Sequence, residues 1–441
     1  MKSLPHFSSD YEHLSEKALE TALSRVPAYS NWRKYDPGTS MPVDLRYNAL
    51  PVITKRDLRQ HSWRGFVPDN LDIESALQNG VIELVNTSGT TQERVTNVWY
   101  QPWWNESEAQ SWHYNIHTAT LPLGNHREAI LTSPLNVGVL AEKGLLSMKE
   151  RTLGRFLYLN EKANPSLWDD NIIRRIIREM EIYEPVVLEA NPSYLAKIAR
   201  YAHRHNIAVF QPGAVVLTYE NPGILTRKYI RRAFNAPLIS SYGSTETGYV
   251  LMECEKGKMH QVSSSCRIDL EYLYPEYGQP NIGRLLTTTF TNPWRSLIRF
   301  DAGDLVEIDA SVTCSCGRND GYIFREVAGR TANLTYSTAG LPVTSSTIET
   351  ALAGIESILE YQVIQQAGLY DVNIVLDDDI AASPSLRDEI IERLLPFYGR
   401  AAAIKVHFID EIQAEASGKY RLTRSDIMMD DDKLFLKGGY R

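Results

Sequence analysis

The amino-acid sequence predicts an α/β protein, with a large N-terminal α/β domain that contains a β-rich part and a small, mobile α+β C-terminal domain. Two observations lead to this fold class. Between residues 80 and 240, short apolar stretches of strand length alternate with amphipathic stretches of helix length, as in a largely parallel sheet covered by helices. From 250 to 328 the chain is instead rich in β-branched residues with short turns, which favours a β-rich part.

The expected elements follow in chain order. A helix at 10–27 and a short strand or turn leading into a helix at 50–60 come first. Strands are expected at 129–135, 185–190, 207–219 (as a strand pair, or a strand and turn) and 236–243, and helices at 168–182, 193–206 and 226–234. After the Gly329-Arg330 pair, helices are expected at 345–354 and 385–397 and strands at 361–366, 372–376 and 404–410. We therefore predict a large domain at 1–330 and a small one at 331–441.

Composition excludes several classes of protein. With 441 residues, 43% of them hydrophobic and 23% charged, the chain is long enough for two or three domains with large cores. A net charge of −8 with scattered Lys and Arg gives no electrostatic footprint for nucleic acid. The sequence shows no apolar run of membrane-spanning length and no signal-peptide pattern, so we expect a cytoplasmic protein without a membrane partner. Four cysteines in a reducing compartment indicate metal ligands or free thiols before disulfides.

A run of small polar residues follows the short apolar segment at 83–86. It reads Thr87-Ser88-Gly89-Thr90-Thr91. Ser, Thr and Gly favour turns, so a simple turn is one interpretation. A cradle of hydroxyl and backbone N–H groups around a phosphate is the other.

A second candidate stretch follows the expected strand at 236–243. It reads Tyr242-Gly243-Ser244-Thr245-Glu246. In an open α/β sheet, ligands bind beyond the carboxyl ends of the strands, where these residues would lie. An aromatic ring for stacking, a glycine for close approach and a carboxylate for Mg²⁺ would suit a nucleotide. Tyr242 as a core aromatic is the alternative.

Two further residues are candidates by position. Asp304 follows Gly303 in "RFDAGDLV", where a carboxylate would accept both hydroxyls of a ribose; a turn residue before a strand is the alternative. Lys419 follows a glycine in "EASGKYRLTRS" and is either a catalytic cation or a solvated loop lysine. Short motifs of this kind are hypotheses when taken singly.

Jointly and in this order, the motifs resemble those of the adenylate-forming enzymes, in the branch similar to phenylacetate–coenzyme A ligase. That pattern runs a Thr/Ser/Gly loop, a "YGSTE" loop, a "GD" turn, a "GR" hinge and a late "GK" lysine. The stretches "LPVITKRDLR", "EANPSYLA" and "LTYE" also look like this branch, so the resemblance covers residues 20 to about 425.

The resemblance implies roles for individual residues. The loop at 87–91 would hold the β- and γ-phosphates of ATP. Within it, Thr91 would be one of the catalytic residues. Tyr242 would pack on adenine, Glu246 would help to hold Mg²⁺, and Asp304 would bind the ribose. Arg330 would contact the ribose or a phosphate, and Lys419 would bridge the substrate carboxylate and the α-phosphate. Gly243, Ser244 and Thr245 would complete the nucleotide site.

The sequence departs from the family pattern in two places. After the phosphate loop, the usual Gly-x-Pro and lysine are replaced by Gln92-Glu93-Arg94-Val95, although Arg94 would supply a nearby positive charge. Beside the hinge, the acidic pair of the family is replaced by Ala332-Asn333. This replacement would affect the movement at the hinge more than the nucleotide chemistry.

The cysteines favour a structural zinc site. Cys254 and His260 lie close together in "ECEKGKMH", and Cys314 and Cys316 form a C-x-C. Three thiolates and an imidazole make a closed tetrahedral zinc site, which holds no activated water and would pin the β-rich part. Cys266 is the rival fourth ligand, but the resemblance favours His260. Small buried thiols without a metal are the alternative.

Other signals carry less weight. His113 and His117 are spaced like metalloprotease ligands on an expected helix, but the Glu beside the first His is missing. The tryptophans at 99, 103 and 104 would line the core or a substrate wall, and the C-terminal stretch 428–441 would be a solvated tail.

We therefore expect an ATP- and Mg²⁺-dependent ligase that activates a small carboxylic acid, suspected to be an aryl acid, and passes it to coenzyme A. Transfer to a carrier-protein thiol or an amine, or an arrest at adenylylation, is the second hypothesis. A zinc-stabilised nucleotide-binding protein without turnover is the third. The resemblance alone suggests a homodimer.

Overall fold

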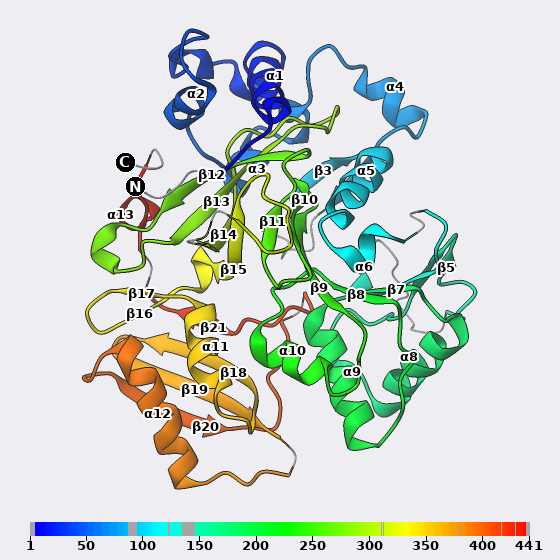
Figure 1. Ribbon diagram of the computed structural model, residues 1–441, viewed down its shortest axis with the longest axis vertical. Coiled ribbons are helices and arrows are strands. Elements are labelled where there is room, and N and C mark those ends of the chain that lie inside the picture. Colours follow the sequence, from blue (N-terminus) through cyan, green and yellow to red (C-terminus); the bar gives the residue numbers. More distant parts are fainter. Residues whose placement is uncertain are drawn as a thin grey trace. The chain divides into compact units, whose positions relative to one another are not determined.

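The computed structural model describes residues 5–86, 95–121, 124–134, 146–309, 311, 313–377, 379–415, 417–427 and 429–437 of the chain (Figure 1). These residues form two compact units. The first comprises 1–120, 241–327 and 430–441, and the second comprises 121–240 and 328–429. Both units are therefore assembled from separated stretches of sequence.

The first unit is built on a mostly antiparallel sheet with the strand order β12-β13-β14-β15-β11-β10-β9, and β1 pairs in parallel with β14. The strands are β1 (Ile53–Thr54), β9 (Leu238–Ser244, from residue 241 on), β10 (Gly248–Glu253), β11 (Met259–Gln261), β12 (Cys266–Tyr272), β13 (Ile282–Thr289), β14 (Phe300–Ile308) and β15 (Ile323–Arg330). Strands β2 (Glu83–Asn86) and β3 (Thr96–Trp99) form a separate antiparallel pair.

The helices of the first unit are α1 (Ser9–Arg25), α2 (Val43–Ala49), α3 (Lys55–Gln60), α4 (Ile73–Gln78), α5 (Gln101–Trp112), α6 (Ile116–Ala119) and α13 (Asp431–Leu434), with 3-10 turns at Pro27–Tyr29, Trp32–Lys34, Trp63–Phe66 and Pro275–Tyr277. Leu19 and Leu23 of α1 share one buried cluster with Tyr29, Phe66 and Phe300. This cluster ties the N-terminal helices to β14.

Buried ion pairs cross the strands β12, β13 and β14. Arg284 pairs with Glu271 at 2.6 Å and with Asp301 at 3.2 Å, and Arg299 pairs with Glu271 at 2.6 Å. Removing one partner of such a pair leaves an uncompensated buried charge, which costs several kcal/mol. The pairs therefore favour this strand register, which sets the position of the β14 residues that follow Asp301.

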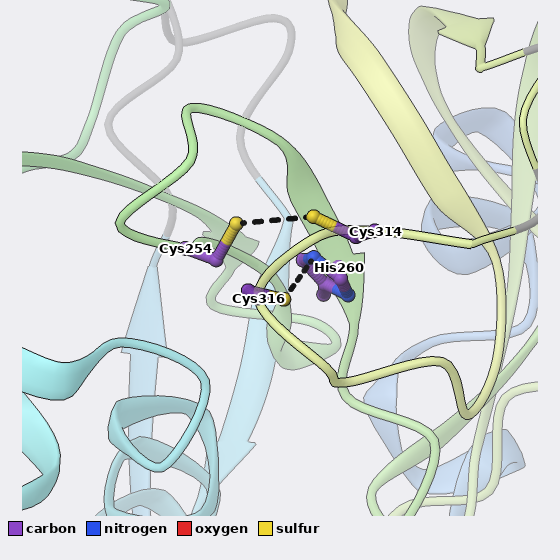
Figure 2. A group of neighbouring side chains, drawn as sticks. All are labelled: Cys254, His260, Cys314 and Cys316. Carbon is purple, nitrogen blue, oxygen red and sulfur yellow. Dashed lines mark hydrogen bonds between the residues drawn. The ribbon is translucent and has the colours of Figure 1, made fainter.

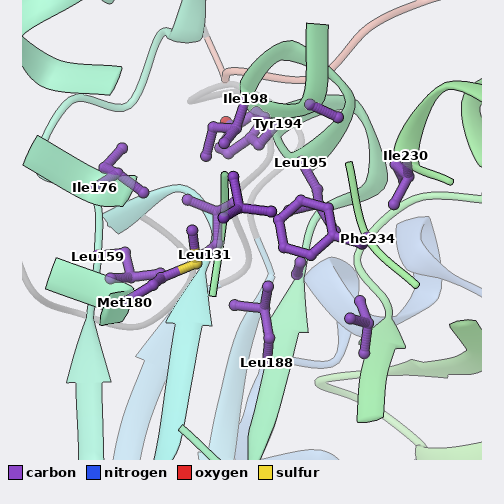
Figure 3. Close-up of a cluster of buried hydrophobic side chains, with 14 of the residues drawn as sticks. Leu131, Leu159, Ile176, Met180, Leu188, Tyr194, Leu195, Ile198, Ile230 and Phe234 are labelled. Carbon is purple, nitrogen blue, oxygen red and sulfur yellow. The ribbon is translucent and has the colours of Figure 1, made fainter. Parts of the chain in front are cut away.

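The second unit contains a sheet with the order β9-β8-β7-β4-β6-β5, parallel except for β5. Its strands are β4 (Glu128–Leu131), β5 (Thr152–Leu153), β6 (Phe156–Tyr158), β7 (Val187–Ala190), β8 (Ala214–Leu217) and the start of β9, and its helices are α8 (Asp170–Tyr183), α9 (Pro192–Arg204) and α10 (Ile224–Ile230), with a 3-10 turn at Pro165–Leu167. Figure 3 shows how Leu131 and Leu188 of the strands meet Met180 of α8 and Leu195 of α9 in the core.

Residues 328–429 add a four-stranded sheet to the second unit, with the order β20-β19-β18-β21. Its elements are β18 (Ile358–Gln366), β19 (Leu369–Leu376), β20 (Ala403–Phe408) and β21 (Thr423–Ser425), with α11 (Ser345–Ala353), α12 (Pro384–Tyr398), a 3-10 turn at Thr331–Asn333 and a small hairpin of β16 (Thr335–Tyr336) and β17 (Pro342–Val343). Strands, helices and their alternation confirm the predicted α/β class. The division of the chain at Arg330 stays a prediction.

Two local expectations were wrong, and one open alternative is resolved. The stretch 207–219 contains one strand and not a strand pair, since residues 207–213 form no strand and β8 begins only at Ala214, after Pro212, which has no N–H to donate to a ladder. His113 is the C-cap residue that follows α5 and His117 belongs to α6, so the two histidines do not share a helix. Within the described part of the C-terminal stretch, residues 429–437, Leu434 and Phe435 are buried and Phe435 pairs with Leu273 beside β12, so this part is not a solvated tail.

Among the described residues, no helix combines the length and the apolar character that crossing a bilayer requires.

Candidate functional site

The turn between β9 and β10 is fixed by a close backbone approach. Gly243 faces the carbonyl oxygen of Gly248, and a Cβ at position 243 would lie 2.3 Å from that oxygen, so only glycine fits. The Ser244 Oγ accepts the Thr247 backbone N–H at 3.3 Å. Thr245 lies half-buried in the turn between these residues. The turn thus holds Tyr242 on one side and Glu246 on the other.

Tyr242 and Asp304 come together in the first unit. The Tyr242 hydroxyl donates to the Asp304 Oδ2 at 2.9 Å, which joins the end of β9 to the middle of β14. Gly303, at φ +89°, precedes Asp304, and its backbone N–H donates to the Asp301 Oδ1 at 2.7 Å. An aromatic ring and a carboxylate from distant parts of the sequence therefore lie side by side.

Glu246 is a buried carboxylate between two cations. The Lys55 Nζ lies 3.8 Å from the Glu246 Oε1, and Arg295 interacts with Glu246 electrostatically. Burial alone would raise the pKa of Glu246, but the charges of Lys55 and Arg295 outweigh it and hold this pKa below its ordinary value. The Glu246 Oε1 has no hydrogen-bond partner among the described residues. This carboxylate oxygen is of the kind that binds a divalent cation.

Four side chains of the β-rich part converge in a second cluster of the first unit (Figure 2). Cys254 directly follows β10, His260 lies in β11, and Cys314 and Cys316 lie in the connection from β14 to β15. The Sγ atoms of Cys254 and Cys314 are 3.8 Å apart, and the Cys316 Sγ is 3.5 Å from the His260 Nε2. All four ligand atoms lie within 4.8 Å of one another.

These separations fit the edges of a zinc tetrahedron. Zn–S bonds of about 2.3 Å and Zn–N bonds of about 2.0 Å give S–S edges of about 3.8 Å and S–N edges of about 3.5 Å. The backbone N–H groups of Lys256 and Arg318 each donate at 3.4 Å to the sulfur two residues earlier, and Gly257 and Gly317 turn the chain at positive φ. Such N–H donors stabilise thiolates, so the donor set and its surroundings fit the metal.

Burial and hydrogen bonds together set the pKa values in this cluster. Burial lowers the pKa of His260 to about 4, which keeps the imidazole neutral, as a metal ligand must be. Burial also raises the pKa of Cys254 to about 12. Burial acts to raise the pKa of Cys316 as well, but hydrogen bonds from Arg318 and the neighbouring thiols outweigh it and lower this pKa.

Cys266 is separate from the four. It is fully buried among the apolar side chains of the β12–β13 region, and its thiol donates to the Val262 carbonyl at 3.7 Å. Burial raises the pKa of Cys266 well above its ordinary value. The structure thus groups His260, and not Cys266, with the other three cysteines.

Lys419 belongs to a loop of the second unit that packs against Ala163, ahead of α8, and against Tyr194 of α9. Gly418, at φ +82°, passes so close to Ala163 and Tyr194 that an added Cβ would lie 2.2 Å from the Ala163 carbonyl oxygen and from the Tyr194 hydroxyl. Lys197 of α9 pairs with Glu411 at the start of the loop at 2.8 Å. Glycine is therefore required beside Lys419.

Glu220 is the carboxylate on which the charge of Lys419 acts. Its oxygens accept from the Ser193 hydroxyl at 2.7 Å and from the Tyr420 backbone N–H at 3.3 Å. Burial raises the pKa of Glu220, while Ser193 and Lys419 counteract the shift. The preceding Tyr219 adopts φ +73°, an uncommon backbone conformation for a residue with a side chain.

The remaining predicted residues are placed as follows. Arg330 ends β15 and is exposed, directly after Gly329, whose φ of +125° no larger residue adopts easily. Ala332 and Asn333 form a 3-10 turn there, and the Asn333 carbonyl accepts the Thr423 hydroxyl at 2.6 Å. The predicted phosphate loop, residues 87–91, and the altered positions 92–94 lie outside the described residues.

The sequence reasoning missed three residues that the structure associates with these sites. Lys55 and Arg295 lie near Glu246, and Glu220 lies near Lys419. The stretches "TKRDL" and "LTYE" resembled the family and would have pointed to Lys55 and Glu220. No motif in the sequence points to Arg295, because its relevance follows from the burial of its charge near Glu246.

Comparisons with known proteins agree with this architecture. Residues 335–426 match the family model described as the CapK C-terminal domain. The chain is 24% identical to protein CapK of Staphylococcus aureus over 393 residues, which cover 86% of this chain and 80% of that protein.

Solved structures of 2-hydroxyisobutyryl-CoA ligase are similar over nearly the whole chain. Its post-adenylation complex with 2-HIB-AMP matches with a TM-score of 0.69 at 14% identity, covering 96% of this chain and 91% of that one. Its complex with 2-HIB-AMP and CoA in the thioesterification state matches with a TM-score of 0.52 at 17% identity, covering 95% and 89%. This chain therefore has the fold of the adenylate-forming enzymes, as the resemblance of its motifs predicted.

Proposed function

We propose that this protein is a ligase that activates a small carboxylic acid with ATP and Mg²⁺ and transfers the acyl group to coenzyme A. The observation that carries the proposal is the hydrogen bond between Tyr242 and Asp304 beside the turn that bears Glu246. A stacking ring, a carboxylate for two hydroxyls and a carboxylate for a metal are the groups that a nucleotide needs. The fold shared with acyl-CoA ligases supports the same conclusion.

In the proposed nucleotide site, Tyr242 packs on adenine and the Asp304 carboxylate accepts the ribose hydroxyls. The loop at 87–91 holds the β- and γ-phosphates, and Arg330 contacts the ribose or a phosphate. Glu246 is the residue that would hold Mg²⁺, which when bound neutralises phosphate charge. Gly243 allows the close backbone approach that keeps the ring of Tyr242 in place.

Lys419 acts in the first half-reaction. A carboxylate is a weak nucleophile and is repelled by the phosphates, so a cation that contacts both anions lowers the barrier. An oxygen of the acid attacks the α-phosphorus, the bond to the β-phosphate breaks, and pyrophosphate leaves. The thiol sulfur of coenzyme A then attacks the acyl carbon, its proton is released, and AMP leaves. The complex of 2-hydroxyisobutyryl-CoA ligase with an acyl-AMP and CoA supports this order.

The second cluster is proposed as a structural zinc site held by Cys254, His260, Cys314 and Cys316. With four protein ligands it offers no position for a reacting water, so it stabilises the β-rich part and takes no chemical step. A division into a large domain and a small domain at Arg330, and a homodimer, are proposed from the family resemblance alone.

Pyrophosphate exchange tests the proposed function. Labelled pyrophosphate should enter ATP only in the presence of the correct acid, with aryl acids tested first, and addition of coenzyme A should then yield a thioester. Exchange without a thioester would favour a carrier-protein thiol or an amine as the acceptor. If ATP binds but no acid supports exchange, the protein is a nucleotide-binding protein without turnover.

Lys419→Ala tests the role of the lysine. We expect the exchange rate to fall by at least about 100-fold, as when one preorganised donor to a transition state is removed, while the Kd for ATP changes by less than about threefold. Lys405→Ala, which removes an exposed lysine of β20 in the same unit, should leave both quantities unchanged. Undiminished exchange in Lys419→Ala would contradict the assignment.

A further inference from the structure

Glu220 lies where three segments of the second unit meet. It follows the end of β8 by three residues and lies beside the first turn of α9 and the loop that carries Lys419. The Oε2 atom of its carboxylate accepts the Ser193 hydroxyl at 2.7 Å, and the Oε1 atom accepts the Tyr420 backbone N–H at 3.3 Å. Each carboxylate oxygen thus links Glu220 to a different segment, and one link falls on the residue next to Lys419.

The segments that present this carboxylate are themselves anchored. Tyr219, at φ +73°, donates its hydroxyl to Glu189 of β7, which fixes the exit from β8. Asn191, the N-cap of α9, accepts the Ser193 backbone N–H at 2.9 Å and fixes the turn that bears the Ser193 hydroxyl. An uncommon backbone conformation of this kind persists only where the surroundings enforce it, and such residues cluster at functional sites. The direction of the Glu220 carboxylate is therefore set from two sides.

The backbone of the Lys419 loop has contacts of its own. Gly418 packs closely against the Ala163 carbonyl oxygen, and the Lys419 carbonyl accepts the Glu415 backbone N–H at 2.8 Å. These contacts join uncharged groups and do not involve the charge of Glu220. What that charge does reach is the side chain of Lys419.

A lysine side chain needs such a partner if its ammonium is to be placed accurately. The ammonium is carried on a flexible four-carbon stem, and ordering that stem costs up to about 2 kcal/mol. Burial raises the pKa of Glu220, but the Ser193 hydroxyl and the charge of Lys419 oppose this rise, so both favour the ionised carboxylate. The ionised carboxylate in turn favours an ordered ammonium before any substrate is bound.

We propose that Glu220 is a positioning residue that holds the Lys419 ammonium in place for activation of the acid, a role that rests on the proposed function. Glu220 takes no chemical step and acts on the reaction only through Lys419. The ammonium, already ordered, then meets the acid carboxylate and the α-phosphate with little further loss of freedom. The transfer to coenzyme A, in which Lys419 has no part, does not depend on Glu220.

A double-mutant cycle with Lys419 tests this role in the full-length protein. Acid-dependent pyrophosphate exchange is measured at saturating ATP and acid for the wild type, Glu220→Gln, Lys419→Ala and the double variant. Glutamine keeps the size of the side chain and an acceptor for the Tyr420 N–H, but it carries no charge. Glu415→Gln is the matched control, because Glu415 lies in the same loop and pairs at the surface with Arg421 at 3.0 Å.

Glu220→Gln is expected to lower the saturated exchange rate by about 10- to 100-fold, the usual effect of losing an interaction with a charged group. The Kd for ATP should change by less than about threefold, because the loss concerns the transition state. In the Lys419→Ala background the same substitution should change exchange by less than about twofold. Thioester formation from a supplied acyl-adenylate and coenzyme A should stay at the wild-type rate, and Glu415→Gln should match the wild type throughout.

Ser193→Ala gives a second test if Glu220→Gln does not fold. It removes the hydrogen bond that orients the Glu220 carboxylate and leaves the charge in place. The exchange rate should fall by about 2- to 10-fold, and this difference too should disappear in the Lys419→Ala background.

Unchanged exchange in Glu220→Gln, or the same loss with and without Lys419, would overturn the positioning role and leave the proposed function intact. A parallel loss of thioester formation from the supplied acyl-adenylate would also overturn it, since that step does not use Lys419. If Lys419→Ala exchanges at the wild-type rate, the roles of Lys419 and Glu220 both fall. A wild-type protein that exchanges pyrophosphate with no acid would instead overturn the proposed function, and the role of Glu220 with it.

Discussion

Gly418 offers a direct test of whether the position of the Lys419 loop matters for the reaction. Its φ of +82° is a conformation that residues with a Cβ avoid, at a cost of about 1 to 2 kcal/mol. The space around it is also closed. An alanine Cβ would lie 2.2 Å from a backbone oxygen of Ala163 and from the Tyr194 hydroxyl, where ordinary contacts begin at 3.4 Å.

The size of the effect follows from this overlap. Neither the backbone oxygen of Ala163 nor the buried ring of Tyr194 can turn away as a flexible side chain would, so in Gly418→Ala the loop itself must move by about 1 Å or more. Lys419 moves with it, and the backbone hydrogen bond from Tyr420 to Glu220 is strained or lost. A displacement of about 1 Å of a catalytic group can reduce a rate by about 100-fold.

The assay is acid-dependent pyrophosphate exchange, with the midpoint of thermal unfolding measured in parallel. Gly368→Ala is the matched control, because Gly368 also has a positive φ, +73°, but has open space around it. Gly368→Ala should lower the Tm by about 1 °C, the shift that a loss of about 1 kcal/mol gives in a chain of this length, and Gly418→Ala should lower it further because of the steric overlap. Only Gly418→Ala should lose exchange, by about 100-fold. Exchange at the wild-type rate in Gly418→Ala, or an equal loss in Gly368→Ala, would refute the reasoning.

Three other predictions concern the first unit. Elemental analysis should find about one equivalent of zinc, which Cys316→Ser but not Cys266→Ser should reduce; under half an equivalent in the wild type would count against the site. Burial would raise the pKa of Glu246, but neighbouring cations lower this pKa below the ordinary 4.5. The ionised Glu246 carboxylate therefore stabilises the fold above pH 4.5, and this stabilisation is lost as the pH falls through the folded-state pKa. Between about pH 6 and about pH 3, Glu246→Gln should therefore lose less unfolding free energy than the wild type in urea titrations, and an equal loss would disprove the linkage. Phe435→Ala should destabilise the protein by about 3 to 5 kcal/mol, because the ring is 1% exposed, whereas Leu436→Ala, at 39% exposed, should be nearly neutral in the same titrations.

The sequence by itself determined the α/β class and the positions of most strands and helices, because periodicity and turn residues act locally. It also identified the chemical groups: a ring at Tyr242, carboxylates at Glu246 and Asp304, and a Cys/His set near 254 and 314. The choice between His260 and Cys266 was not local. The strands β11 and β12 both present buried side chains, and only their packing groups His260 with the other thiols.

The tertiary structure alone decided which distant residues meet. Leu434 and Phe435 look like part of a charged tail, yet a bridge to Leu273 buries them. Lys55 is an ordinary lysine until the β1–β14 pairing sets it beside Glu246, and no local pattern indicates that the guanidinium of Arg295 is buried near the same carboxylate. The physical reason is that burial and charge pairing depend on contacts between segments far apart along the chain, which no local pattern of residues specifies.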